Sequence, residues 1–139
     1  MQFLIVEDLP DFQEMMREVI LTVDPKAEIT QCMTLSEVAY LNVKPHVILL
    51  DHDLGEPHGR LRNGVDCVRL FKEHFPDAII IGVSGLGHHN ATMIHAGADA
   101  SFVKGRIGSE PDKLALLIRQ LLKLPIVWQH EYEGSTVVE

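Results

Sequence analysis

Two carboxylates, Asp51 and Asp53, follow the apolar run Val47–Leu50, and this is the part of the sequence best suited to chemistry. An acidic group at the end of a buried strand has no packing role, because an unpaired buried charge is unfavourable. Three other apolar runs also end at polar or charged residues. The groups at the four run ends are Glu7 with Asp8, Asp51, Ser84 and Lys104. If these runs are neighbouring parallel strands, then acids, a hydroxyl and an amine share one edge of a sheet.

These groups together favour phosphoryl transfer. If Glu7 or Asp8 lies within about 4 Å of Asp51, the two charges repel by roughly 4 kcal/mol at an effective dielectric constant of 20, and a divalent cation would relieve this. Oxygen ligands favour Mg²⁺, with Mn²⁺ as an alternative, over zinc, and bound Mg²⁺ commonly takes phosphate oxygens as further ligands. Asp51 could then act as the nucleophile on phosphorus, while Lys104 and Ser84 stabilise charge on the transferred group.

The elements that must position these groups alternate regularly along the chain. Apolar residues recur at helical spacing over 11–23, and Thr34 and Glu37 have the spacing of a capping box. The predicted strands are 3–6, 27–31, 47–51, 79–83 and 100–104. The predicted helices are 11–23, 34–41, one that begins near Val65 and is stopped by Pro76, 90–95, and one opened by Ser109 and Pro111 that continues through 121. This alternation predicts an α/β fold, a doubly wound five-stranded parallel sheet with helices on both faces.

Size and composition limit the class of protein. A chain of 139 residues, 46% hydrophobic and 23% charged, suits one globular domain. A net charge of −8 argues against direct binding to nucleic acid, and no apolar run approaches the roughly 20 residues that span a membrane. The start lacks a basic leader, and the two cysteines, Cys32 and Cys67, suit reduced thiols. We therefore expect a cytoplasmic protein without a membrane association.

The ordered set Glu7, Asp8, Asp51, Ser84 and Lys104 resembles that of a response-regulator receiver domain of two-component signalling. The resemblance covers residues 1–124 and leaves 125–139 as a C-terminal tail, either disordered or an interaction segment. It implies the flavodoxin-like strand order 2-1-3-4-5. It also implies a partner that donates the phosphoryl group, a histidine kinase or a histidine phosphotransfer protein, and a downstream protein target or a self-dimer. Such a domain is a phosphoprotein that transfers and loses its own phosphoryl group without being a turnover enzyme.

The resemblance assigns a role to each residue at the site. Asp51 matches the phosphoacceptor, and Glu7 and Asp8 match the acids that bind Mg²⁺ together with it. Lys104 matches the phosphate-binding lysine, and Ser84 matches the switch hydroxyl.

Two further positions belong to the same resemblance. Phe102, two residues before the lysine, matches the aromatic residue whose rotation accompanies phosphorylation. Asp53 matches the residue whose backbone carbonyl binds the metal, and its own carboxylate is a further candidate ligand. We expect this extra charge to change metal affinity or the lifetime of the aspartyl-phosphate; an Asp53→Asn variant with both unchanged would contradict that hypothesis.

The sequence departs from the family pattern in several places. Gly105 and Gly55 replace usual prolines, which leaves the isomer of the Lys104–Gly105 peptide open, and Gly64 lies farther from Asp51 than usual. We therefore expect an insertion within Glu56–Asn63, whose arginines either contact a partner or are solvated.

Other functions compete with this interpretation. The Asp51-x-Asp53 pair also resembles haloacid-dehalogenase-type phosphatases, but those enzymes place their metal-binding acids after the lysine, whereas Glu7 and Asp8 precede it. A module that acts by interaction alone, without phosphorylation, is a third alternative.

His88, His89 and His95 lack the spacing of a structural zinc site, and we expect them to be exposed. The orientation of His52 is left open. No nucleotide-binding loop is present.

Overall fold

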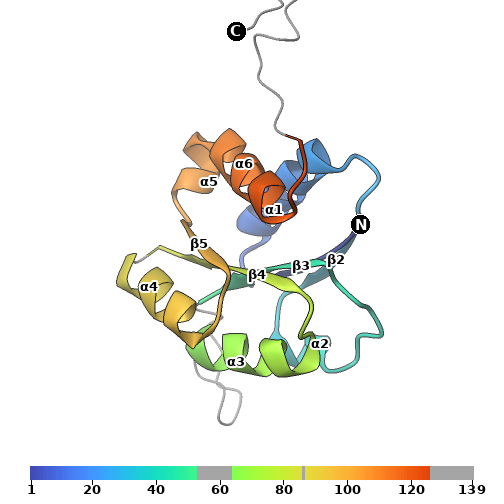
Figure 1. The fold of residues 1–139 in the computed structure, drawn as a ribbon, viewed down its shortest axis with the longest axis vertical. Coiled ribbons are helices and arrows are strands. Elements are labelled where there is room, and N and C mark those ends of the chain that lie inside the picture. The colour runs from blue at the N-terminus through green and yellow to red at the C-terminus, as the bar shows by residue number, and fades with distance from the viewer. Residues whose placement is uncertain (53–63, 86, 126–139) are drawn as a thin grey trace, which may run out of the picture.

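Residues 1–52, 64–85 and 87–125 are described by the computed structural model. They form a sheet covered by helices on both faces (Figure 1). The strands are β1 (Gln2–Val6), β2 (Glu28–Cys32), β3 (Val47–Asp51), β4 (Ile79–Ser84) and β5 (Ala100–Val103). The helices are α1 (Pro10–Val23), α2 (Leu35–Val38), α3 (Gly64–His74), α4 (Gly87–Ala96), α5 (Arg106–Ser109) and α6 (Pro111–Leu121).

The sheet is parallel throughout, and its order is β2-β1-β3-β4-β5. This confirms the predicted doubly wound fold and its strand order. Every residue of β3 is buried, as expected for a central strand with helices on both sides. Helices cover the central strands on both sides, so the residues at their carboxyl ends have well-defined positions.

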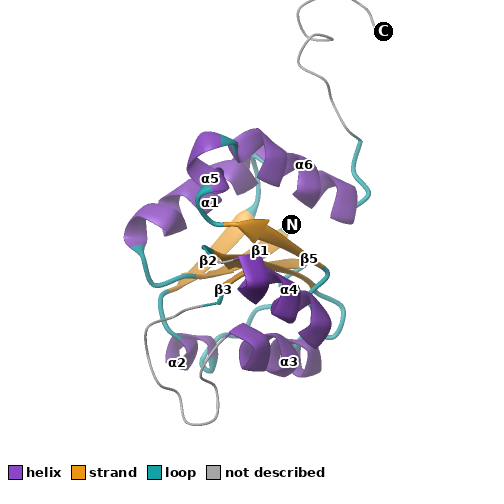
Figure 2. Cartoon of the chain, turned by 90° about the vertical axis from the view of Figure 1, so that its left-hand side faces the viewer, coloured by secondary structure: helices purple, strands orange, loops and turns teal. Residues whose placement is uncertain are grey.

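Side chains of the central strands alternate between two hydrophobic clusters. Phe3, Val47 and Ile81 face the layer formed by α1, α5 and α6. Leu4 and Ile48, one position along their strands, face the layer formed by α2, α3 and α4. Figure 2 shows these two helix layers on opposite sides of the strands. A period of two along each strand places alternate residues on opposite faces, which accounts for this division.

The last part of the fold contains one element that the sequence did not predict. A single turn, α5, precedes α6, and its Ile107 is buried in the cluster beneath α1. Ser109 ends α5, so its predicted role as the helix cap is wrong; Glu110 is the N-cap residue of α6, without a side-chain cap hydrogen bond, and Pro111 occupies the first turn. Proline fits this position because its missing N–H has no helical partner there.

The remaining boundaries differ from the predictions by small amounts. The Thr34 half of the capping box is present, since the Glu37 backbone N–H donates to Thr34 Oγ1 at 3.3 Å, whereas the Glu37 carboxylate accepts from the Met33 N–H at 3.2 Å. Helix α2 ends at Val38 rather than Leu41. Helix α4 begins earlier than predicted and ends before Gly97, which has a φ of +119°. Glycine adopts this backbone conformation without the strain that a side chain would bring. Cys32 and Cys67 are both buried and free, as predicted.

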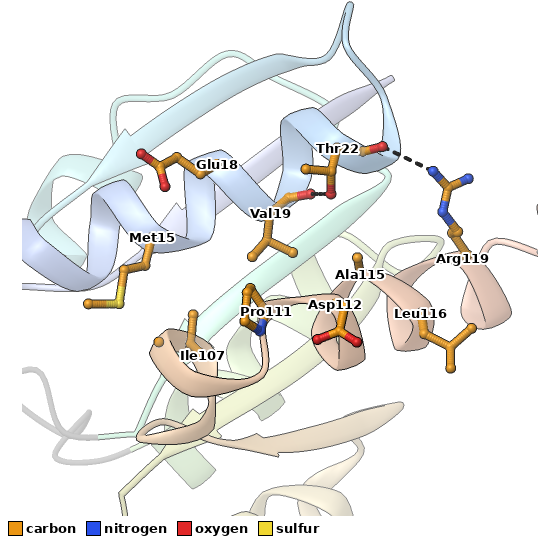
Figure 3. Close-up of a pocket in the computed structure, with 11 residues that line it drawn as sticks. Met15, Glu18, Val19, Thr22, Ile107, Pro111, Asp112, Ala115, Leu116 and Arg119 are labelled. Atoms are coloured by element: carbon orange, nitrogen blue, oxygen red, sulfur yellow. Dashed lines mark hydrogen bonds between the residues drawn. The ribbon is translucent and has the colours of Figure 1, made fainter. Parts of the chain in front are cut away.

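Helix α6 packs against α1, and the two helices enclose a hollow of about 600 Å³ together with α5 (Figure 3). Arg119 donates a hydrogen bond to the backbone carbonyl of Thr22 at 3.0 Å and joins the helices at one end of this hollow. Met15 and Ile107 line the opposite part. No helix within the described ranges is long and apolar enough to cross a membrane.

Polar contacts connect the elements at the amino-terminal ends of the strands. The Gln2 backbone N–H donates to His46 Nδ1 at 3.0 Å, and the Ile80 N–H donates to Asp99 Oδ2 at 2.8 Å. Lys72 of α3 also binds Asp99 Oδ2, at 3.1 Å. These contacts join strands and helices at the edge opposite the carboxyl ends.

Gly82 lets α4 approach β4 closely. A Cβ atom on Gly82 would lie 2.8 Å from Sδ and 3.2 Å from Cβ of the buried Met93. We therefore expect Gly82→Ala to lower the free energy of unfolding by about 1 to 2 kcal/mol, because Met93 must move within a packed core. Urea denaturation checks this value. Gly85→Ala is the matched control, since nothing lies within 4 Å of its added Cβ, and an equal loss in both variants would contradict the packing argument.

Candidate functional site

The carboxyl ends of β1, β3, β4 and β5 bring the predicted groups to one edge of the sheet. Strand register pairs Val6 with Leu50, and Asp51 with Val83. The residue after Val6 therefore lies beside Asp51, and Ser84 lies one step further along the next strand. In open parallel sheets this edge is where ligands bind.

Lys104 lies between two buried carboxylates. Its Nζ is 2.8 Å from Glu7 Oε1 and 3.4 Å from Asp51 Oδ1. Glu7 and Asp51 are 0% and 1% exposed, so water screens these charges poorly. Phe12 of α1 places its ring 4.7 Å from Lys104 Nζ, a cation–π contact on the same ammonium group. One cation thus faces two desolvated acids.

The pKa values reflect this imbalance of charge. Burial, and then the charge of Asp51, raise the pKa of Glu7 to about 7, although the hydrogen bond from Lys104 acts in the opposite direction. Burial alone lowers the pKa of Lys104, but the hydrogen bond to Glu7 and the charge of Asp51 outweigh it and raise that pKa. Lys104 therefore remains an ammonium group, whereas Glu7 binds a proton near neutral pH when no other cation is present.

Gln13 fixes the loop that carries Glu7, a role that was not predicted from the sequence. Its side-chain amide donates at 2.9 Å to the carbonyl oxygens of both Glu7 and Cys32, and its own oxygen accepts from Gln31 Nε2 at 2.9 Å. The Leu9 N–H donates to Glu7 Oε2 at 3.1 Å. A buried glutamine on a helix face that is otherwise apolar was the available signal.

Glu7, Asp8 and Asp51 fit a divalent cation. Each offers one carboxylate oxygen, and the three oxygens lie within 4.8 Å of one another. Asp8 is half-buried and the other two are buried. Three converging carboxylates without a sulfur or imidazole ligand suit a hard cation such as Mg²⁺. Asp53, the fourth predicted ligand, and the predicted Glu56–Asn63 insertion lie outside the described residues.

Ser84 is buried at the end of β4, where two residues of α4 contact it. Its Oγ lies 3.4 Å from Nδ1 of His89, and its backbone carbonyl accepts from Asn90 Nδ2 at 3.4 Å. The expectation that His89 is exposed is wrong: it is half-buried, and its ring stacks on His52, which is 8% exposed. His52, which is distant in the sequence, covers His89. A local sequence pattern does not show a contact of this kind.

Phe102 is the aromatic residue before the lysine, and it points into the core. It is 7% exposed within the cluster of α1, α5 and α6, and the Arg106 guanidinium carbon lies 5.4 Å from the centre of its ring. The Lys104–Gly105 peptide is trans, which resolves the isomer that the sequence left open.

The stability of the protein should depend on the pKa of Glu7. Its folded pKa of about 7 exceeds the ordinary value of 4.5, so the folded state binds more protons between these pH values. The resulting stabilisation is fully present below about pH 4.5 and is lost as the pH rises through 7, by at most about 3 kcal/mol. Urea denaturation at pH 5 and pH 8 measures this loss.

The Glu7→Gln variant is the control for this prediction, because a neutral amide does not titrate. We expect it to lose less stability than the wild type between pH 5 and pH 8. Mg²⁺ should also reduce the loss in the wild type, since a cation favours the ionised carboxylate. Parallel pH profiles for the two proteins would contradict the assignment of the loss to Glu7.

The fold described above is similar to those of several solved structures. No family model and no curated protein matches the sequence. The chain is similar to the BeF3-activated receiver domain of DrrB, with a TM-score of 0.74, 19% identity, and coverage of 88% of this chain and 97% of that one. The chain has a response-regulator receiver fold. The sheet order 2-1-3-4-5 is the strand order of this fold.

Two further solved structures are similar to this chain in fold. The signal receiver domain of a DNA-binding response regulator from Colwellia psychrerythraea 34H has a TM-score of 0.71 and 22% identity, covering 88% of this chain and 98% of that one. The response regulator TrrA from Thermotoga maritima, solved in complex with Mg²⁺-BeF, has a TM-score of 0.68 and 21% identity, covering 86% and 97%. The similarity thus extends over almost the whole length of all three proteins.

Proposed function

We propose that this protein acts in two-component phosphorelay signalling by accepting a phosphoryl group on Asp51. The observation that carries the proposal is the position of Asp51: a buried carboxylate at the end of a central strand, next to Lys104 and two further acids. A carboxylate held in this way has no structural need to be there, since an apolar residue would fill β3 without the desolvation of a charge. The receiver fold supports the same conclusion.

The reaction follows from the groups at the site. An Asp51 oxygen attacks the phosphorus of a phosphohistidine, the P–N bond breaks, and the released imidazole takes up a proton. Lys104 neutralises charge on the transferred group, and the Ser84 hydroxyl donates a hydrogen bond to one of its oxygens. Glu7, Asp8 and Asp51 would hold Mg²⁺, which neutralises the phosphate charge that these acids would otherwise repel. The Mg²⁺-BeF complex of TrrA supports this choice of metal.

The donor in this proposal is a histidine kinase or a histidine phosphotransfer protein, and the output is contact with a downstream protein or a second copy of the chain. The phosphoryl group is accepted once per molecule and then lost, so the protein is not a turnover enzyme. The cytoplasmic location and the absence of direct binding to nucleic acid stay predictions.

One experiment tests the proposal and its alternatives. The wild type is incubated with acetyl phosphate, with Mg²⁺ or with excess EDTA, and intact mass is followed over time. We expect the mass of one phosphoryl group to be added with Mg²⁺ and none with EDTA. A wild type that stays unmodified under both conditions favours a module that acts by interaction alone, and repeated hydrolysis of a phosphomonoester favours a phosphatase.

A further inference from the structure

Two histidines from distant parts of the chain stack beside the acceptor strand. The ring centroids of His52 and His89 are 3.8 Å apart, and the ring planes differ by 17°. His52 directly follows Asp51 at the end of β3, and His89 lies in the first turns of α4. The pair therefore connects the residue next to the proposed phosphoacceptor with the helix that follows Ser84.

Hydrogen bonds to the backbone of β4 support both ends of this connection. The His52 N–H donates to the carbonyl of Val83 at 2.9 Å, so the backbone of His52 is fixed to β4 immediately before Ser84. The side-chain amide of Asn90 donates to the Ser84 carbonyl at 3.4 Å, which is a second, weaker contact of α4 with the same point. These contacts bring the backbones of His52, Ser84 and His89 close together, so a reorientation of side chains is enough to change the hydrogen bonds among them.

The hydroxyl of Ser84 is the movable group. Its Oγ lies 3.4 Å from His89 Nδ1, longer than the usual range for a strong hydrogen bond. A serine hydroxyl carries only one hydrogen to donate. If that hydrogen is directed to His89, it is not available to an oxygen of a phosphoryl group on Asp51. The weakness of the contact is what allows a phosphoryl group to replace it.

We propose that His89 is a positioning residue. Its ring accepts a hydrogen bond from the Ser84 hydroxyl in the unphosphorylated protein, and this hydrogen bond is broken when Asp51 is phosphorylated. Stacking on His52 holds the His89 ring at the required place. This role rests on the proposed function, since it concerns the same site. It makes His89 a competitor of the phosphoryl group and thereby adjusts the affinity of the site for that group.

Beryllofluoride, a phosphoryl mimic, tests the proposal in the presence of Mg²⁺. In His89→Phe a flat ring can still stack on His52, but the nitrogen that binds Ser84 is gone. We expect beryllofluoride to bind this variant two- to five-fold more tightly than the wild type, the effect of removing one weak competing hydrogen bond. His95→Phe is the matched control, because His95 is exposed on the same helix, and its affinity should be unchanged.

A double-mutant cycle separates positioning from a general structural effect. In a Ser84→Ala background no hydroxyl remains, so His89→Phe should leave the affinity for beryllofluoride unchanged. Unfolding by urea confirms that each variant is folded. If His89→Phe weakens binding or leaves it unchanged in the wild-type background, or produces the same tightening in both backgrounds, the proposal is overturned.

Nitrogen NMR of the histidine rings provides an independent observation, with the His89 signals assigned by their loss in His89→Phe. We expect Ser84→Ala and beryllofluoride binding to move the His89 Nδ1 signal in the same direction, because both remove the hydroxyl donor. A wild type that does not bind beryllofluoride contradicts the proposed function and this role together. A wild type that binds it with an unchanged His89 signal contradicts the positioning role alone.

Discussion

Replacing Asp51 by asparagine should abolish phosphorylation by acetyl phosphate while the protein stays folded. The amide has the same shape but is not nucleophilic toward phosphorus. Among the described residues, Lys104 contacts two carboxylates, and Asp51 is the one that lies within a strand. Glu7, the other acid at Lys104, is in the loop after β1 rather than in a strand. Intact mass after incubation with Mg²⁺ measures the result.

Asp51→Asn should not reduce stability at neutral pH. It removes one of two buried acids that share a single ammonium group, so the pKa of Glu7 should fall and Glu7 should pair with Lys104 as an anion. Urea denaturation at pH 7 checks this. Asp77→Asn is the matched control, because Asp77 is exposed and lies before β4, and it should leave phosphorylation unchanged. Modification of Asp51→Asn at the wild-type rate would identify another acceptor.

Replacing Lys104 by methionine should have the largest effect on stability. The variant removes the ammonium group that contacts both of the buried acids Glu7 and Asp51, and loss of one partner from a buried ionic group typically lowers stability by about 3 kcal/mol or more. The loss should be larger at pH 8 than at pH 5, because Glu7 can bind a proton at the lower pH. Mg²⁺ should recover part of it by supplying a cation.

The same variant should be phosphorylated roughly a hundred-fold more slowly, since charge on the transferred group loses its fixed ammonium partner. Lys113→Met is the control, because the side chain of Lys113 is 55% exposed and, among the described residues, forms an ion pair with Glu110. Urea denaturation with and without Mg²⁺, and the rate of mass increase, measure the two effects. Equal stability of Lys104→Met and Lys113→Met at pH 8 would mean that the buried ion pair does not stabilise the fold.

The strands and the meeting of their end residues were predictable because of burial. A parallel strand with helices on both faces, such as Val47–Asp51, appears in the sequence as an unbroken apolar run that stops at its first functional residue. Since parallel strands end at the same edge, Asp51 and Lys104 could be placed together without any knowledge of their contacts. The similarity to known receiver folds then agrees with the strand order.

The features that were not predicted depend on contacts between distant residues or on very short elements. Helix α5 is one turn held by the burial of Ile107, and one turn is too short to show a helical period. Ser109 resembled a helix cap, but Pro111 fixes the start of α6 so that Glu110 takes the cap position. The burial of His89 depends on His52, a residue 37 positions earlier by sequence number, and no local pattern records that pairing.

The contacts at the amino-terminal ends of the strands have a practical consequence for engineering. His46, Asp99 and Lys72 fasten that end of the sheet, about five residues, or roughly 16 Å, from the acidic edge. This exceeds the screening length of about 8 Å in physiological salt, so charges exchanged there barely alter the potential at Asp51. Stability could therefore be raised by substitutions at that end while the electrostatic surroundings of Asp51 are left unchanged.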